Sequence, residues 1–120
     1  TGPGNMEEHL RALLAEGFTA FILIPVEWIS RCVKTIRESG REIPRDVSLI
    51  VYEEPAVTPF QSPPLTAFAF DYPELVRKAL DQLLLEIDGE KGESQIVVPT
   101  RLTLRESTGP CPAMDVGDAR

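Results

Sequence analysis

The sequence predicts an α/β fold in which a parallel sheet is flanked by helices. Two segments, 18–24 and 47–51, are apolar without alternation, which is typical of strands covered on both faces. Residues with helical apolar spacing lie between and around them, and helices that alternate with strands favour a parallel sheet. With 120 residues, 42% of them apolar, the chain can bury one small core.

The first expected helix starts at residues 5–8, Asn-Met-Glu-Glu, which have the shape of a capping box. Asn5 stands at the cap position and Glu8 follows three residues later. Gly17 is placed to end this helix, because glycine readily adopts the conformation found just beyond a helix end. The apolar face of the helix carries Leu10, Leu13 and Leu14.

A second helix is expected between the two strands, over about residues 28–39, with Gly40 at its end. Its apolar side carries Ile29, Cys32, Val33 and Ile36. A turn set by Pro44 leads from this helix into the strand 47–51. The order strand, helix, strand predicts a βαβ unit.

A loop of about a dozen residues, 53–64, follows the second strand and shows no helical period. Loops of this length inside compact domains are usually functional or interfacial. A strand is expected over 65–70. An amphipathic helix is expected over 71–87, where Asp71 and Glu74 have the spacing of an N-terminal cap.

Two short strands, 95–98 and 101–104, are expected after this helix. Pro99 separates them, and because proline cannot donate a ladder hydrogen bond, they should lie at an edge or be joined by a bend. Residues 109–120 hold Gly, Pro and Asp and are expected to be a disordered tail. Residues 1–5 are interpreted as a cloning scar or a linker.

Composition excludes several classes of function. The net charge of −7 and the pI near 4.7 predict that this piece repels a phosphate backbone. No apolar run approaches the roughly 18 residues that span a bilayer, so no membrane segment is expected. Cys32 and Cys111, the two cysteines, stand in contexts that suggest no disulfide framework, which fits a reducing, cytoplasmic compartment.

Catalytic chemistry has few candidates in this sequence. His9 is the single histidine, and there is no metal-spaced Cys/His cluster, nucleophile elbow or phosphate-binding glycine loop. Glu53 and Glu54 are adjacent carboxylates, but neighbours on an extended segment point in opposite directions and do not readily share a site. We therefore expect no enzyme activity, no metal site and no cofactor.

The best candidates for ligand contact follow the two buried strands, because ligands of open parallel sheets bind beyond the carboxyl ends of strands. These residues are Glu27 and Trp28 after the first strand and Tyr52 and Glu53 after the second. Carboxylates accept hydrogen bonds from hydroxyl groups, and aromatic faces offer a stacking surface, a combination suited to polyols and sugars. The alternative is structural: Glu27 would favour a helix start, and Trp28 and Tyr52 would only pack.

Three motifs, in order and at matching spacing, resemble the C-terminal part of the LacI/GalR family of bacterial repressors. They are RESGREIPRDVSLIVYEE at 37–54, PPLTAF at 63–68 and REST at 105–108. The family patterns are roughly R-x-x-G-x-x-[VI]-P-x-D-V-S-[VI]-[VI]-[GV]-[FY]-D-[DN], P-P-L-T-T-[VI] and R-x-S-T. The resemblance covers about residues 6–110. It implies a periplasmic-binding-protein-like type I fold, with residues 6–108 as the C-terminal portion of an effector-binding and dimerisation domain.

The resemblance points to the same two strand ends for a small-molecule effector, with one departure. LacI-type proteins commonly carry Asn-Asp after the first strand, where this chain has Pro25 and Val26, whose side chains form no hydrogen bonds. After the second strand the acidic pair is Glu53-Glu54, which extends the reach of each carboxylate by one methylene. These differences put a usual sugar effector in doubt. They indicate a less hydroxylated or more apolar ligand, or a protein that has lost small-molecule control.

A homodimer surface is implied on the helix 28–39 and the loop around 59–62, which form much of the dimer contact in LacI-type proteins. The contact would be isologous about a two-fold axis. Trp28, Val57 and Phe60 are large apolar residues there without an obvious core role, and exposed apolar patches usually mark interfaces. The residues expected in the contact are Arg31, Lys34, Thr35, Phe60 and Gln61. The alternative is that Phe60 packs under its own loop.

A complete LacI-type chain begins with a helix-turn-helix DNA reader and a hinge, followed by two linked α/β subdomains with the effector between them. The resemblance therefore implies a transcriptional regulator that binds DNA only through an N-terminal helix-turn-helix absent from this chain. In its implied mechanism, the ligand changes the angle between the subdomains. The alternatives are a periplasmic solute-binding protein of a sugar transporter, which shares the fold, and an α/β enzyme with its catalytic residues elsewhere.

In the LacI-type fold the helix 71–87 crosses to the first subdomain. Its apolar face has no such partner in this sequence. We expect this helix either to pair with a second copy or to be partly disordered. The pairing residues would be Leu80, Leu83, Leu84 and Ile87.

Overall fold

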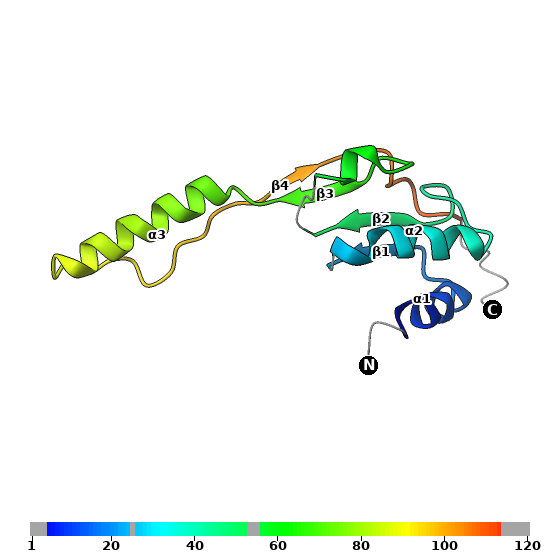
Figure 1. The fold of residues 1–120 in the computed structure, drawn as a ribbon, viewed down its shortest axis with the longest axis horizontal. Coiled ribbons are helices and arrows are strands. Elements are labelled where there is room, and N and C mark those ends of the chain that lie inside the picture. Colours follow the sequence, from blue (N-terminus) through cyan, green and yellow to red (C-terminus); the bar gives the residue numbers. More distant parts are fainter. Residues whose placement is uncertain (1–4, 25, 53–55, 114–120) are drawn as a thin grey trace.

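The computed structural model describes residues 5–24, 26–52 and 56–113. In chain order the elements are α1 (Met6–Ala15), β1 (Ala20–Leu23), the 3₁₀ helix η2 (Val26–Trp28), α2 (Ile29–Glu38), β2 (Ser48–Val51), the 3₁₀ helix η3 (Thr58–Phe60), β3 (Thr66–Ala69), α3 (Tyr72–Ile87) and β4 (Arg101–Thr103). Figure 1 shows a body of sheet and short helices from which α3 projects. The molecule therefore measures 64 Å along its long axis but only 37 and 31 Å across.

The strands form one sheet in the order β1-β2-β3-β4. The first three are parallel, as expected, with Leu23 opposite Val51 and Val51 opposite Ala67. The fourth strand is antiparallel to β3, with Phe68 opposite Leu102, so the sheet is mixed. It lies at the edge of the sheet, in keeping with the effect expected of Pro99.

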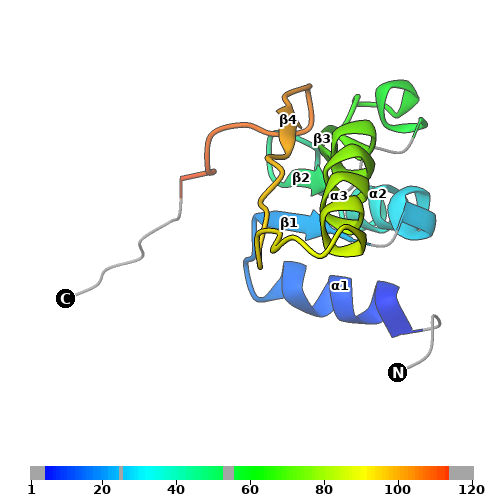
Figure 2. The same cartoon turned by 90° about the vertical axis from the view of Figure 1, so that its left-hand side faces the viewer.

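One apolar core joins α1, α2 and the sheet. Its buried residues are Leu10, Leu14, Leu23, Ile29, Cys32, Val33, Ile36, Val47, Leu49, Val51, Leu65 and Ala67. All four residues expected on the apolar side of α2 are among them, because their helical spacing places them on one face. In Figure 2, α1 runs alongside β1 at the outer edge of the sheet, with α2 on a different side of the same strand.

Asn5 stands at the N-terminal cap position of α1, as expected, but without the capping hydrogen bond, whereas the expected cap of α3 is confirmed. Asn5 has near-helical backbone angles, φ −107° and ψ 0°, and its side chain makes no capping hydrogen bond. Asp71 does cap α3: its Oδ1 accepts a hydrogen bond from the Glu74 N–H at 3.1 Å. The difference lies in the backbone, since a cap side chain reaches the helix only from a non-helical conformation.

The segment after α3 differs from the expectation. Residues 95–98 form no strand; they run back along α3, where Ile96 and Val98 line a shallow hollow together with Leu75 and Ala79. No described strand lies beside this segment, and β4 begins only at Arg101. The apolar pattern of the segment therefore serves packing against a helix. Part of the expected loop also differs, because Thr58–Phe60 form one 3₁₀ turn.

The motif at 105–108 fastens the amino ends of β2 and β3. Ser107 is fully buried; its Oγ donates to the Leu49 carbonyl at 2.5 Å and accepts from the Thr66 N–H at 2.8 Å. The Leu49 N–H donates to the Ser107 carbonyl at 2.8 Å, and Arg105 Nη1 donates to the Leu65 carbonyl at 2.7 Å. The motif is thus structural, and it lies at the sheet edge opposite the carboxyl ends of these strands.

The tail beyond the motif starts on the sheet. The Gly109 N–H donates to Ser48 Oγ at 3.1 Å. The following residues up to Ala113 have no regular secondary structure. The expectation of disorder for 114–120 lies outside the described residues, as does the expected linker at 1–4.

Candidate ligand-binding edge of the sheet

The carboxyl ends of β1, β2 and β3 lie at one edge of the sheet because the three strands are parallel. Tyr52 follows β2 directly, and its N–H donates to the Leu23 carbonyl of β1 at 2.8 Å. Phe70 and Tyr72, one on each side of Asp71, lie where the chain passes from β3 into α3. This is the edge at which open parallel sheets bind ligands.

Three aromatic rings meet at this edge, and we call Tyr52, Phe70 and Tyr72 the aromatic cluster. The ring centroids of Tyr52 and Phe70 are 5.3 Å apart with an interplanar angle of 77°, an edge-to-face contact. Phe70 and Tyr72 are 5.8 Å apart with their planes tilted by 48°. Tyr52 is 40% exposed and Tyr72 52% exposed, so the cluster forms part of the surface.

The local chain explains why these rings converge. The sheet register places Val51 opposite Ala67, β3 ends at Ala69, and Phe70 follows it directly, past the level of Tyr52. The cap formed by Asp71 starts α3 at once, which holds Tyr72 in the first turn, one residue beyond the cap. The cluster is therefore fixed by a strand end and a helix start.

A hollow of about 490 Å³ with a mixed polar and apolar lining adjoins Phe70 at the start of β4. It is lined by Ala69, Phe70, Asp71, Pro73, Pro99, Thr100 and Arg101. Asp71 has already committed one carboxylate oxygen to the helix cap. The guanidinium of Arg101 and the hydroxyl of Thr100 add hydrogen-bonding groups.

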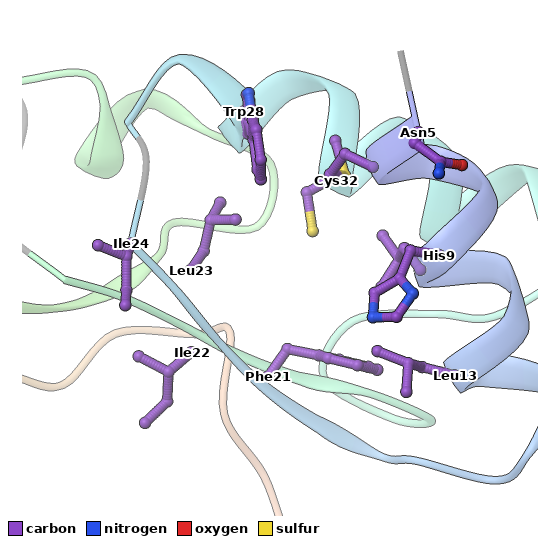
Figure 3. A pocket seen from close by; sticks show the side chains of 11 residues that line it. Asn5, His9, Leu13, Phe21, Ile22, Leu23, Ile24, Trp28 and Cys32 are labelled. Atoms are coloured by element: carbon purple, nitrogen blue, oxygen red, sulfur yellow. The ribbon is translucent and has the colours of Figure 1, made fainter. Parts of the chain in front are cut away.

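The two residues expected after β1 have different places. Glu27 is exposed in η2, in the first turn before α2, where an acidic side chain favours the helix dipole. Trp28 is half-buried against the core. It lines a mostly apolar cavity of about 440 Å³ between α1, β1 and α2 (Figure 3). Packing, the structural alternative, therefore describes Trp28 well.

The same cavity contains Cys32 and, on its α1 side, His9 and Asn5 (Figure 3). Burial raises the pKa of the Cys32 thiol to about 11, so this cysteine stays protonated and unreactive at neutral pH. Across the residues that the structure describes, no group of three or more His, Cys, Asp or Glu side chains could hold a metal ion.

Glu53 and Pro25 lie outside the described residues, as does Glu54. Val26, the second residue of the departure from the family pattern, is half-buried and packs against the core. It thus adds apolar surface and no hydrogen-bonding group near the end of β1.

Four of the five residues expected at a dimer contact lie at least partly on the surface. Phe60 is 87% exposed, so the alternative that it packs under its own loop is wrong. Lys34 is exposed, with its Nζ 3.7 Å from Glu38 Oε1, and Gln61 is half-buried. Thr35 is buried within the chain itself, so its side chain is not available to a second copy.

Arg31 joins α2 to α1. Its Nε and Nη2 donate to the two carboxylate oxygens of Glu7 at 2.5 and 2.7 Å. The hydrogen bond from Arg31 is the main cause that lowers the pKa of Glu7 below its usual value. The helix α2 is also tied to the loop of Phe60, because Arg37 Nη2 donates to the Ser62 carbonyl.

A family profile described as a periplasmic binding protein-like domain matches residues 9–108. The chain belongs to this family. Within it, the resemblance to LacI-type regulators is confirmed by relatives and by structures. The HTH-type transcriptional regulator MalR of Streptomyces coelicolor is 28% identical over 102 residues, which are 84% of this chain and 30% of the relative. The HTH-type transcriptional repressor MelR of Bacillus subtilis is 28% identical over 97 residues, 81% of this chain and 28% of the relative.

Solved structures match the fold of this periplasmic binding protein-like domain. A LacI family transcriptional regulator from Bifidobacterium animalis superposes with a TM-score of 0.78 at 28% identity, covering 88% of this chain and 40% of the other. The lac repressor dimer bound to operator and the anti-inducer ONPF gives 0.71 at 25% identity, with 84% and 36% covered. The chain spans about a third of the length of the regulators it matches.

The sequence reasoning found Tyr52 but missed Phe70 and Tyr72. The end of the expected strand 65–70 is the signal that could have found them, because ligands of open parallel sheets bind beyond the carboxyl ends of strands.

No described helix is long and apolar enough to cross a membrane.

Proposed function

We propose that this chain forms one wall of the effector cleft and part of the dimer contact of a LacI-type transcriptional regulator. DNA would be bound through an N-terminal helix-turn-helix outside this sequence, and the effector would be a sugar-like or related small molecule. The observation that carries the proposal is that three parallel strands bring their carboxyl ends to one edge, in a chain whose relatives are regulators. The names of these relatives favour a regulator over a transport receptor or an enzyme.

The proposed mechanism is a hinge between subdomains. The aromatic cluster lies where β3 passes into α3, and α3 leads away from the body (Figure 1). A ligand that contacts Phe70 and Tyr72 would act on the backbone that sets the direction of α3. Ligand binding and subdomain angle would thus be coupled, and the angle would set the spacing of two DNA-binding heads.

DNA binding by the intact protein encoded by the gene tests the regulator assignment. We expect specific binding to a DNA fragment from upstream of its own gene, measured by fluorescence anisotropy. One compound from a panel of glycosides and nucleosides should change the affinity by about 5-fold or more. The 120-residue chain alone is the control and should not bind, because its net charge is −7. An intact protein that binds no upstream DNA under any condition would contradict the proposal.

The dimer contact is proposed to centre on Phe60 and Lys34. A large exposed aromatic residue at an interface centre often contributes much of the binding energy. We expect Phe60→Ser to raise the dimer dissociation constant of the intact protein by about 10-fold or more, measured by sedimentation equilibrium. Val57→Ser, at a nearby exposed apolar position that is not among the five expected contact residues, should have a smaller effect. An unchanged dimer in Phe60→Ser would rule out this surface.

A further inference from the structure

We propose that the effector carries an aromatic ring and that this ring packs against the aromatic cluster formed by Tyr52, Phe70 and Tyr72. The class of ligand is an aromatic ring joined to a polyol, which includes aryl glycosides and nucleosides. The inference rests on the proposed function, because it assumes that the carboxyl edge of the sheet binds an effector.

The arrangement of the rings leaves stacking surface open. An edge-to-face pair such as Tyr52 and Phe70 covers at most one face of one of its two rings. The tilted contact between Phe70 and Tyr72 likewise leaves ring faces without parallel cover. Because both tyrosines are 40% exposed or more, a planar ligand can reach these faces.

The composition of the cluster also favours a ring-bearing ligand. The 120 residues include only two tyrosines, and both lie in the cluster. Tyrosine combines a large apolar face with a polar tip, which suits a site that is wet on one side. A ring placed on this surface would extend the existing row of aromatic contacts.

Several described residues at this edge have apolar side chains. Ile24 and Val26 near the end of β1 and Phe70 after β3 offer no hydrogen-bonding group. Asp71 already accepts from the Glu74 N–H. A free monosaccharide presents several hydroxyl groups, each of which needs a partner when it is taken out of water. It would leave these apolar side chains unused, whereas a ligand with an aromatic ring can pack against them.

The neighbouring hollow provides for the polar part of such a ligand. It begins at Phe70 and contains the hydroxyl of Thr100 and the guanidinium of Arg101. An aromatic ring on the cluster and a polyol toward this hollow would use both surfaces at once. The shared chemistry is therefore an aromatic ring with an attached sugar.

Paired ligands that differ only in the ring test the inference on the intact protein. The pairs are phenyl and methyl glycosides of glucose and galactose, and adenosine or uridine against methyl riboside, each titrated by calorimetry. We expect the ring-bearing member of one pair to bind about 10-fold or more tightly than its ring-free partner. Phe70→Leu should bring this ratio down toward one, while Phe18→Leu, at an exposed position before the amino end of β1, should leave it unchanged.

Fluorotyrosine labelling gives a direct readout of contact. The ¹⁹F signals of Tyr52 and Tyr72 are identified by their loss in Tyr52→Phe and Tyr72→Phe. Both signals should shift with the ring-bearing ligand and not with its ring-free partner. Retained binding of the ring-free ligand by Phe70→Leu, with unchanged circular dichroism, would show that the variant is folded.

The outcomes separate the inference from the proposed function. If both members of every pair bind equally and the two tyrosine signals do not move, the aromatic ligand is ruled out while effector binding survives. If no compound binds although the intact protein binds its DNA, the effector cleft and the aromatic ligand both fall. Glycoside selectivity without nucleoside binding identifies an aryl glycoside as the source of the ring, and the reverse result identifies a nucleoside.

Discussion

The helices α2 and α3 carry similar amphipathic patterns but have opposite fates in the structure. Five of the ten residues of α2 are buried, whereas none of the sixteen residues of α3 is. The core of the body covers α2, while α3 stands away from it and touches mainly the returning segment 93–98 (Figure 1). An apolar stripe thus predicts a helix and its need for cover, but not what provides the cover.

The uncovered stripe of α3 is large. It is made of Val76, Leu80, Leu83, Leu84 and Ile87, with exposures from 51% to 70%. The helix is continuous throughout, so the expected alternative of partial disorder does not describe this structure. Pairing of the stripe with a second copy stays a prediction.

The largest difference between the two helices should appear on truncation to alanine. Ile36→Ala in α2 should lower the free energy of unfolding by about 2–5 kcal/mol, because Ile36 is fully buried and a cavity would remain. Leu84→Ala in α3 should change it by only about 0.5 kcal/mol, since this side chain is 58% exposed. Both changes are measured by denaturing the 120-residue chain and following the fluorescence of Trp28, its single tryptophan. Equal losses would mean that α3 is covered in solution.

The fastening of the body should give the next largest effect. Ser107→Ala removes the hydroxyl that joins Leu49 to Thr66. The buried Leu49 carbonyl and Thr66 N–H then lose this hydrogen-bond partner. We expect a loss of about 1–3 kcal/mol in the same unfolding measurement. Ser94→Ala, at an exposed position beside α3, is the matched control and should be nearly neutral. A neutral Ser107→Ala would show that other groups satisfy these partners.

The cap of α3 should contribute less. Asp71→Ala should cost about 0.5–2 kcal/mol of helix stability, because the Glu74 N–H loses its acceptor. Circular dichroism at 222 nm should show a lower melting temperature of the helical signal. Asp81→Ala, in the middle of the same helix, removes only an exposed contact to Arg77 at 3.0 Å and should have a smaller effect. A larger effect at Asp81 would contradict the assigned cap.

The smallest effect should come from the ion pair between α1 and α2. Arg31 lowers the pKa of Glu7 in the folded state, so the pair stabilises the fold above the usual glutamate pKa. This contribution is lost as the pH falls through the lower folded value. Glu7→Gln and Arg31→Gln should each remove the same part of the acid dependence of stability, measured by denaturation at a series of pH values. Two variants with different acid profiles would show that the two groups do not act as a pair.

Much of the fold could be predicted from the sequence because the relevant signals are local. The apolar runs at 18–24 and 47–51, the spacing of Ile29 to Ile36 and the cap at Asp71 each indicate one element by themselves. The capping hydrogen bond expected from Asn5 and the strand expected at 95–98 are absent, because a backbone angle decides the first and a packing partner the second. The same pattern of residues occurs with or without a capping hydrogen bond, and in a strand or in a segment packed against a helix.

Signals in short segments of the sequence were enough to predict the three α-helices, the four strands and the resemblance to LacI-type regulators. These follow from periodicity, turn residues and motif spacing, which are properties of short segments. Three other features depend on the folded arrangement: Tyr52, Phe70 and Tyr72 meet, Ser107 joins two strands, and Thr35 is buried. Contacts between residues far apart in the chain depend on how strands register and where helices leave the sheet, and no local pattern encodes them.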